Sequence, residues 1–115
     1  MADFIQTAKD QLKDMILGAM GSAVAAGELA NEPIPAFTVQ IPADKAHGDF
    51  ATNAAMVSAR AFHLAPRKIA EILCSHLILD GTYFERCEIA GAGFINFFLS
   101  RRWFADVINN VNQEK

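Results

Sequence analysis

The clearest pattern along this chain is a stripe of apolar side chains over residues 3–26. The stripe recurs at spacings of three and four, which place side chains on one face of an α-helix. Polar residues fill the opposite face, and Gly27 follows as a natural stop. We therefore predict an amphipathic helix over residues 3–26, with an inward face made of Phe4, Ile5, Ala8, Leu12, Met15, Ile16, Ala19, Met20, Ala23 and Val24.

Two short segments in the middle of the chain have the pattern of strands. Residues 37–41 alternate apolar and polar side chains until Pro42, which is typical of a strand half buried in a sheet. Residues 48–52 are predicted to form a second strand. Thr52 or Asn53 then caps a helix, whose shared apolar face comprises Ala55, Met56, Ala59 and Phe62.

The second half of the chain predicts a helix, a hairpin and a last helix. The first of these helices runs from Pro66 to the break at Asp80-Gly81, with an apolar face of Ile69, Ile72, Leu73, Leu77 and Ile78. Residues 85–90 and 94–99 then form two strands joined by the turn Gly91-Ala92-Gly93. Ser100 is predicted to cap the last helix, which turns inward Trp103, Phe104, Val107, Ile108 and Val111.

The order of these elements defines the expected fold class. One helix, two strands, two helices, two strands and one helix follow each other, with connections too short for many parallel crossovers. We predict a single α+β domain over residues 1–115: a two-layer domain with a mainly antiparallel four-stranded sheet and helices packed on it.

Composition narrows the class of protein. Hydrophobic residues make up 52% and charged residues 20% of the chain, which supplies a core and shows no bias toward disorder. Two cysteines, Cys74 and Cys87, are too few for a disulfide framework, so we expect free thiols and a cytoplasmic protein. No secretory signal or membrane segment is visible.

The charge argues against a protein that holds nucleic acid by charge alone, because the net charge is −3. Any RNA contact must therefore be local. A basic edge could form from Arg67-Lys68, Arg86 and Arg101-Arg102, although scattered arginines are also what an ordinary solvated surface contains.

Candidates for catalysis or metal binding are poor. His47 and Asp49 could form an acid-base pair, but the intervening Gly48 favours a turn in which a side chain bonds local backbone amides. Cys74 and His76 point to different sides of their predicted helix. The Gly91-x-Gly93 pair lacks the third glycine of a dinucleotide-binding loop. We predict no catalytic residue, no metal site and no cofactor in this domain.

The unusual feature is the second face of the strand over residues 94–99. Alternation places Phe94, Asn96 and Phe98 together on the face opposite Ile95, Phe97 and Leu99. On an open face, aromatic rings stack with unpaired bases and an amide pairs with a base edge, which favours RNA binding. Two alternatives remain: a helix covers this face as well, or the phenylalanines serve a self-associating regulatory or interaction module.

Three stretches of the chain resemble the arginyl-tRNA synthetases, specifically their additional N-terminal domain. They are Val39–Pro42 running into His47–Ala55, the helix opening Ala65–Ala70, and Ile89–Leu99, and together they span most of the chain in the family's order. The resemblance implies a domain that contacts the D-loop of tRNA(Arg), with Phe94 against a base, Asn96 on its edge and Phe98 as a weaker candidate. Some members have asparagine where this chain has Gly91.

The same resemblance implies what lies outside this chain. The family's catalytic core carries a His-Ile-Gly-His-like motif and a lysine-rich loop, and this sequence contains neither. The core would follow Lys115, so that residues 1–115 would be the N-terminal part of a longer synthetase. The intact enzyme would join arginine to tRNA with ATP and magnesium. This domain alone is expected to be non-catalytic and monomeric, with no membrane or DNA partner.

Overall fold

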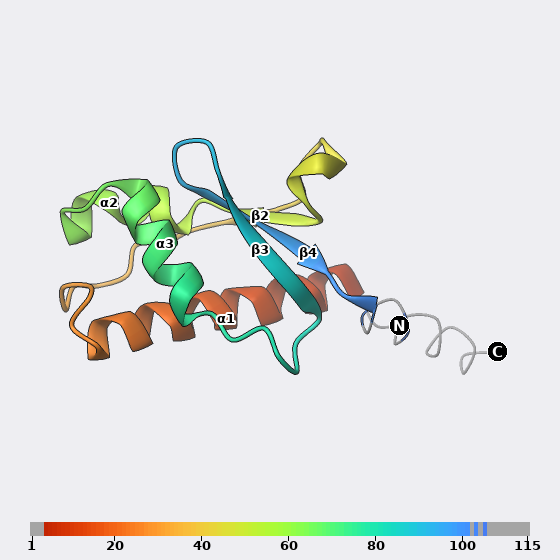
Figure 1. The fold of residues 1–115 in the computed structure, drawn as a ribbon, viewed down its shortest axis with the longest axis horizontal. Coiled ribbons are helices and arrows are strands. Elements are labelled where there is room, and N and C mark those ends of the chain that lie inside the picture. Colours follow the sequence, from red (N-terminus) through yellow and green to blue (C-terminus); the bar gives the residue numbers. More distant parts are fainter. Residues whose placement is uncertain (1–3, 102, 104, 106–115) are drawn as a thin grey trace.

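The computed structural model describes residues 4–101, 103 and 105 (Figure 1). Its elements, in chain order, are α1 (Phe4–Ala25), β1 (Val39–Gln40), the short 3₁₀ helix η1 (Lys45–His47), β2 (Phe50–Thr52), α2 (Ala54–Phe62), α3 (Pro66–His76), β3 (Phe84–Ala90) and β4 (Phe94–Leu99). Of the helices in the described part of the chain, none combines the length and the apolar character that crossing a bilayer requires.

The strands form one antiparallel sheet in the order β1-β2-β4-β3. Helices α1 and α3 pack against one face of this sheet, and the loop that carries η1 lies on the other side (Figure 1). The predicted α+β class with an antiparallel four-stranded sheet is therefore confirmed. The hairpin of β3 and β4 is also confirmed, with residues 91–93 as its turn.

The core lies between the sheet and the helices. Phe84 contacts both Phe50 and Phe97 edge to face, with ring centroids 5.9 Å apart in each pair. The predicted stripe of α1 supplies the opposite wall through its buried Ala8, Leu12, Ile16, Ala19, Met20 and Ala23. One member of that stripe is wrong, because the Ile5 side chain is 41% exposed near the start of the helix.

The strand predicted over residues 37–41 is shorter than its pattern suggests. Thr38 lies outside the ladder because two side chains bind its backbone: Thr52 Oγ1 donates to its carbonyl at 2.8 Å, and Asn53 Oδ1 accepts from its N–H at 2.8 Å. Asn53 therefore gives α2 no side-chain cap. Thr52 takes that role in part, accepting a hydrogen bond from the Ala54 N–H at 3.2 Å.

Helix α3 ends at His76, four residues before the predicted break. The chain continues in extended form, so side chains alternate: Leu77 and Leu79 pack against the core, whereas Ile78 is 76% exposed. Burying two leucines in this way overrides the helical spacing of residues 69–78, and the prediction that Ile78 faces inward is wrong.

The predicted last helix is only partly described. Arg101, Trp103 and Ala105 are helical, and Trp103 packs against the core. The Ser100 carbonyl accepts a hydrogen bond from the Trp103 N–H at 3.2 Å, but the Ser100 hydroxyl binds none of the described residues. The predictions for Arg102, Phe104, Val107, Ile108 and Val111 lie outside the described residues.

Candidate nucleic-acid interface

A row of four residues crosses the outer face of the sheet, opposite the core. Strand register pairs Asn96 of β4 with Ala51 of β2 on one side and with Glu88 of β3 on the other. Ala51 in turn pairs with Gln40 of β1. Paired residues of neighbouring strands point to the same face, so Gln40, Ala51, Asn96 and Glu88 stand side by side there.

The loop between β1 and β2 stands beside this row and borders an open pocket of about 380 Å³. Asn96 and Ala51 lie deepest in it, with exposed fractions of 5% and 6%. We call this the sheet pocket; its full lining is Gln40, Pro42, Ala43, His47, Ala51, Ala90, Gly91, Phe94 and Asn96. The lining thus comes from the sheet, the hairpin tip and the loop that carries η1, and not from α1, α2 or α3.

The His-Gly-Asp sequence fixes this loop to β4. Gly48 has φ +88°, and a Cβ built on it would lie 2.7 Å from the Phe97 carbonyl oxygen, so only glycine fits. The next residue bonds the same strand twice: the Asp49 N–H donates to the Phe97 carbonyl at 2.8 Å, and Asp49 Oδ2 accepts from the Leu99 N–H at 2.9 Å. The predicted structural role is right, but the side chain's partner is 50 positions away and not local.

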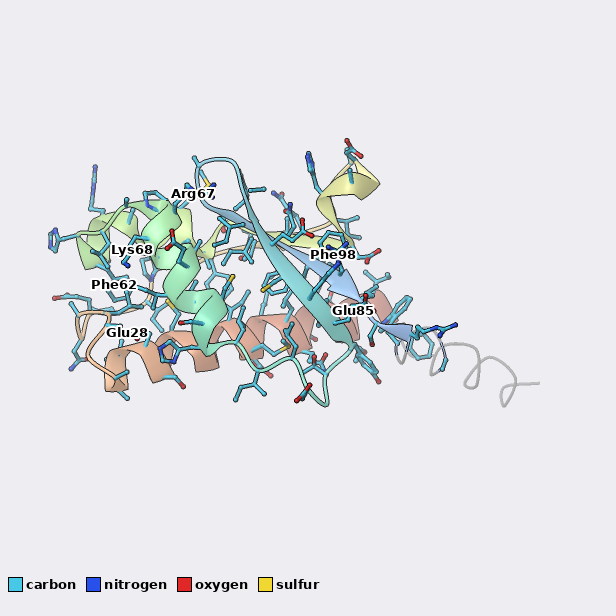
Figure 2. The ribbon with its side chains drawn as sticks, viewed as in Figure 1. Glu28, Phe62, Arg67, Lys68, Glu85 and Phe98 are labelled. Atoms are coloured by element: carbon cyan, nitrogen blue, oxygen red, sulfur yellow. The ribbon has the colours of Figure 1, made fainter. Side chains whose placement is uncertain are left out.

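The hairpin tip is fixed against the start of α3. Gly93 has φ +140°, and a Cβ there would lie 2.7 Å from the Cβ of Pro66. Arg67 Nη1 donates to the Gly91 carbonyl oxygen at 2.8 Å, and Figure 2 shows Arg67 beside the turn. The predicted basic edge therefore begins with an arginine whose guanidinium holds the backbone of the turn.

The structure brings two of the three sequence-predicted side chains together. Phe94, half-buried, and Asn96 both line the sheet pocket. Phe98, labelled in Figure 2, shares their face but does not line the pocket. It lies beneath the Arg86 guanidinium, whose carbon is 3.7 Å from the ring centroid. Arg86 also pairs with Glu88. Alternation predicted an open face at Phe94, Asn96 and Phe98. The structure has a pocket there instead, because the η1 loop stands beside Phe94 and Asn96 while Arg86 covers Phe98.

The cysteine and histidine of the Cys74-x-His76 pair point to different partners, as predicted. The Cys74 and Cys87 sulfurs are 3.5 Å apart and both thiols are free. Their hydrogen bond, with burial adding to it, raises the pKa of Cys74, and the same bond lowers the pKa of Cys87 below its ordinary value. The described residues contain no group of three or more histidine, cysteine or acidic side chains that could hold a metal ion.

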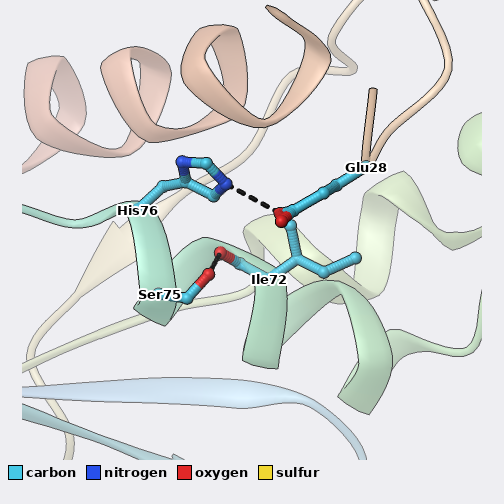
Figure 3. Close-up of polar contacts among 4 residues, drawn as sticks. All are labelled: Glu28, Ile72, Ser75 and His76. Atoms are coloured by element: carbon cyan, nitrogen blue, oxygen red, sulfur yellow. Dashed lines mark hydrogen bonds and ion pairs between the residues drawn. The ribbon is translucent and has the colours of Figure 1, made fainter. Parts of the chain in front are cut away.

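His76 takes part in a separate arrangement near α3. Its Nε2 is 2.7 Å from the Glu28 carboxylate oxygen Oε2, and the Ser75 hydroxyl donates to the Ile72 carbonyl at 2.7 Å (Figure 3). Glu28, Ile72 and Ser75 also line a second pocket of about 420 Å³, together with Lys68 and Glu71. This second pocket has two carboxylates, Glu28 and Glu71, and one ammonium group, Lys68, so its charge disfavours binding of a polyanion.

Sequence reasoning missed Gln40 and His47 as parts of the site. Gln40 occupies the polar position of the predicted strand, so its outward direction was readable. Its place in the pocket was not, because the order of strands in the sheet sets which residues share a row. His47 reaches the pocket through the η1 loop, whose position depends on contacts with β4.

Residues 6–99 match the family described as the arginyl tRNA synthetase N terminal domain. The chain belongs to this family. An arginine–tRNA ligase of Acetivibrio thermocellus is 40% identical over 115 residues, which is 100% of this chain and 20% of the relative. An arginine–tRNA ligase of Caldanaerobacter subterraneus subsp. tengcongensis is 43% identical over 98% of the chain and 20% of its own length. This arginyl-tRNA synthetase N-terminal domain thus spans about a fifth of these relatives.

Solved structures show the same fold. The domain superposes on arginyl-tRNA synthetase of Plasmodium falciparum with a TM-score of 0.63 at 19% identity, covering 83% of this chain and 16% of that one. For the enzyme of Thermus thermophilus the TM-score is 0.60 at 23% identity, covering 82% and 14%. The resemblance to the family noted from three sequence stretches is therefore confirmed.

Proposed function

We propose that this domain binds the D-loop of tRNA(Arg) as the N-terminal part of a longer arginine–tRNA ligase. In support, its curated relatives are named as such ligases and extend over about five times its length. The catalytic core would lie outside residues 1–115, and the domain alone would be non-catalytic. We place the enzyme in the cytoplasm, in keeping with the free thiols Cys74 and Cys87.

One observation carries the RNA-binding part of the proposal: the side chain of a nearly buried asparagine opens into a pocket. Asn96 is 5% exposed, and the hydrogen bonds among the described residues do not reach its side chain. Its carboxamide is not among the buried unpaired polar groups of the described residues, so it is accessible from the pocket. A ligand with donors and acceptors on a flat edge would satisfy it, and an unpaired base has both.

The other walls of the sheet pocket suit the flat faces of a base. The Phe94 ring, Pro42 and the methyl groups of Ala43, Ala51 and Ala90 are apolar, and base stacking on an aromatic ring contributes about 1–3 kcal/mol. Loops of RNA present splayed bases that reach such pockets, whereas paired bases do not. Phe94 would thus stack and Asn96 would read the edge, with Phe98 outside the pocket as a secondary contact.

ATP and magnesium would belong to the core of the intact enzyme. A self-associating module is less well supported. Phe98 is covered by Arg86, Phe94 is half-buried, and neither is one of the large exposed apolar side chains among the described residues. We therefore propose a monomeric domain.

The test is aminoacylation by the full-length enzyme with Asn96→Ala. Losing one base-edge contact of about 1–3 kcal/mol should raise the KM for tRNA(Arg) about 5- to 150-fold. The kcat at saturating tRNA should stay unchanged, because the reacting atoms lie elsewhere. Thermal unfolding should also be unchanged, since the removed carboxamide makes no hydrogen bond with the described residues and opens into the pocket.

Asn31→Ala is the matched control, because it removes an exposed carboxamide from the loop after α1. Its KM should equal that of the unaltered enzyme. An Asn96→Ala enzyme with the KM of the Asn31→Ala control would refute the site.

A further inference from the structure

We infer that Gln40 is a second base-reading residue, which contacts the base held by Asn96 from the opposite side of the sheet pocket. This inference rests on the proposed function, because it names another residue of the same site. It concerns a residue of β1, which is not part of the β4 stretch that suggested RNA binding.

The register of the sheet places the two carboxamides at either end of a short row. Gln40 pairs with Ala51, and Ala51 pairs with Asn96, so one strand separates them. Neighbouring strands are about 4.8 Å apart, which puts the two backbones about 10 Å from each other. Between them stands only the methyl group of Ala51. A flat ring lying on that methyl group would have one carboxamide at each side.

Other polar groups near Asn96 are less suited to this role. Its neighbour on the β3 side is Glu88, whose carboxylate is engaged by Arg86. Gly91 lines the pocket but has no side chain. His47 stands on the η1 loop and not on the sheet, so its position is not set by strand register.

Gln40 itself is available for a ligand. Its side chain is exposed, lines the sheet pocket, and makes no hydrogen bond with the described residues. A carboxamide carries one acceptor oxygen and two donor hydrogens, so two carboxamides can read two separate edges of one base. A base held at two edges would be fixed in orientation as well as in place. The ligand chemistry is therefore an unpaired nucleobase with hydrogen-bonding groups on two edges.

The test measures aminoacylation kinetics of the full-length enzyme with Gln40→Ala, Asn96→Ala and the double variant. Gln40→Ala should raise the KM for tRNA(Arg) about fivefold, the size of one net hydrogen bond, with kcat unchanged. Because both residues contact one base, the double variant should have a KM below the product of the two single effects. Ile41→Ala is the control for disturbing β1, since Ile41 follows Gln40 in the chain and does not line the pocket.

A second measurement identifies the shared base. The same variants are assayed with tRNA(Arg) transcripts in which each unpaired D-loop base is removed in turn. On the one transcript where Asn96→Ala no longer changes the KM, Gln40→Ala should also have no effect.

The outcomes separate the two proposals. A raised KM for Asn96→Ala with an unchanged KM for Gln40→Ala overturns the inference and leaves the proposed function standing. A Gln40 effect that persists on the transcript lacking the Asn96-dependent base also overturns it. Unchanged KM values for both variants refute both proposals.

Discussion

The two faces of the four-stranded sheet differ in what fills them. The inner face carries Phe50, Phe84, Ile95 and Phe97, which are 0–2% exposed and packed with the helices. On the outer face, Ala51 and Asn96 are also nearly buried, with exposed fractions of 6% and 5%, but both line the sheet pocket beside the η1 loop. Large apolar side chains pack together on the inner side, while small and polar ones leave a pocket on the outer side.

A low exposed fraction of a side chain therefore has two different causes in this sheet. Ile95 and Asn96 are adjacent in β4 and both nearly buried, but Ile95 is surrounded by core side chains, whereas Asn96 faces a pocket. Truncating inner residues should therefore lower stability, and truncating outer residues should lower affinity for tRNA. Substitutions that affect both would mark where the faces are mechanically linked.

The largest effect is expected for Phe97→Ala on the inner face. Removing a fully buried phenylalanine leaves a cavity, which typically costs about 3–5 kcal/mol. Denaturant unfolding of the variant should show this loss. A decrease below about 1 kcal/mol would contradict the assignment of Phe97 to the centre of the core.

Gly48→Ala should lower stability by less than Phe97→Ala does, and it should also weaken tRNA binding. It tests whether the two faces of the sheet are linked, because Gly48 lies against the backbone of Phe97 in β4. The new methyl group would meet the Phe97 carbonyl oxygen at 2.7 Å in a backbone conformation with positive φ, so we expect a loss of about 2–3 kcal/mol. The loop that walls the sheet pocket should also shift and raise the KM for tRNA.

Gly27→Ala is the control that separates backbone strain at positive φ from the steric clash that the new methyl group causes in Gly48→Ala. Gly27 has φ +78° but open space around its Cβ position, so its substitution should cost about 1 kcal/mol, from strain alone. Equal destabilisation by Gly48→Ala and Gly27→Ala, measured by thermal unfolding, would show that the η1 loop does not pack closely against β4 at Gly48.

The smallest effect is expected for Arg86→Met on the outer face. This change removes the cation over Phe98 and the exposed ion pair with Glu88, which together contribute at most about 1 kcal/mol at an exposed site. The KM for tRNA should change less than twofold, because Phe98 does not line the sheet pocket. A change as large as that of Asn96→Ala would make Arg86 or the Phe98 ring beneath it a main contact and not a secondary one.

Local patterns predicted what depends on neighbours in sequence. The apolar stripe over residues 3–26 predicted the ends of α1 to within one residue. Strict alternation in β4 correctly placed Ile95 and Asn96 on opposite faces of the sheet. The hairpin followed from its glycine turn. The family was also identifiable from sequence, because its three stretches stand in order along the chain.

Long-range contacts explain the rest. β1 is short because Thr52 and Asn53 bind the backbone of Thr38, some 14 and 15 positions away. Helix α3 stops early because Leu77 and Leu79 reach the core only in extended form. The pocket wall depends on Asp49 bonding Leu99 across 50 positions. No pattern within a window of ten residues contains these pairs.

The tight approach of Gly93 to Pro66, with Arg67 bound to the Gly91 carbonyl, bears on how an RNA would be received. A hairpin tip secured to a helix has little freedom to lose on binding, so the ordering entropy of association would fall mainly on the nucleotide loop. Flexibility of the RNA, and not of this protein, would then set how fast and how firmly the two combine.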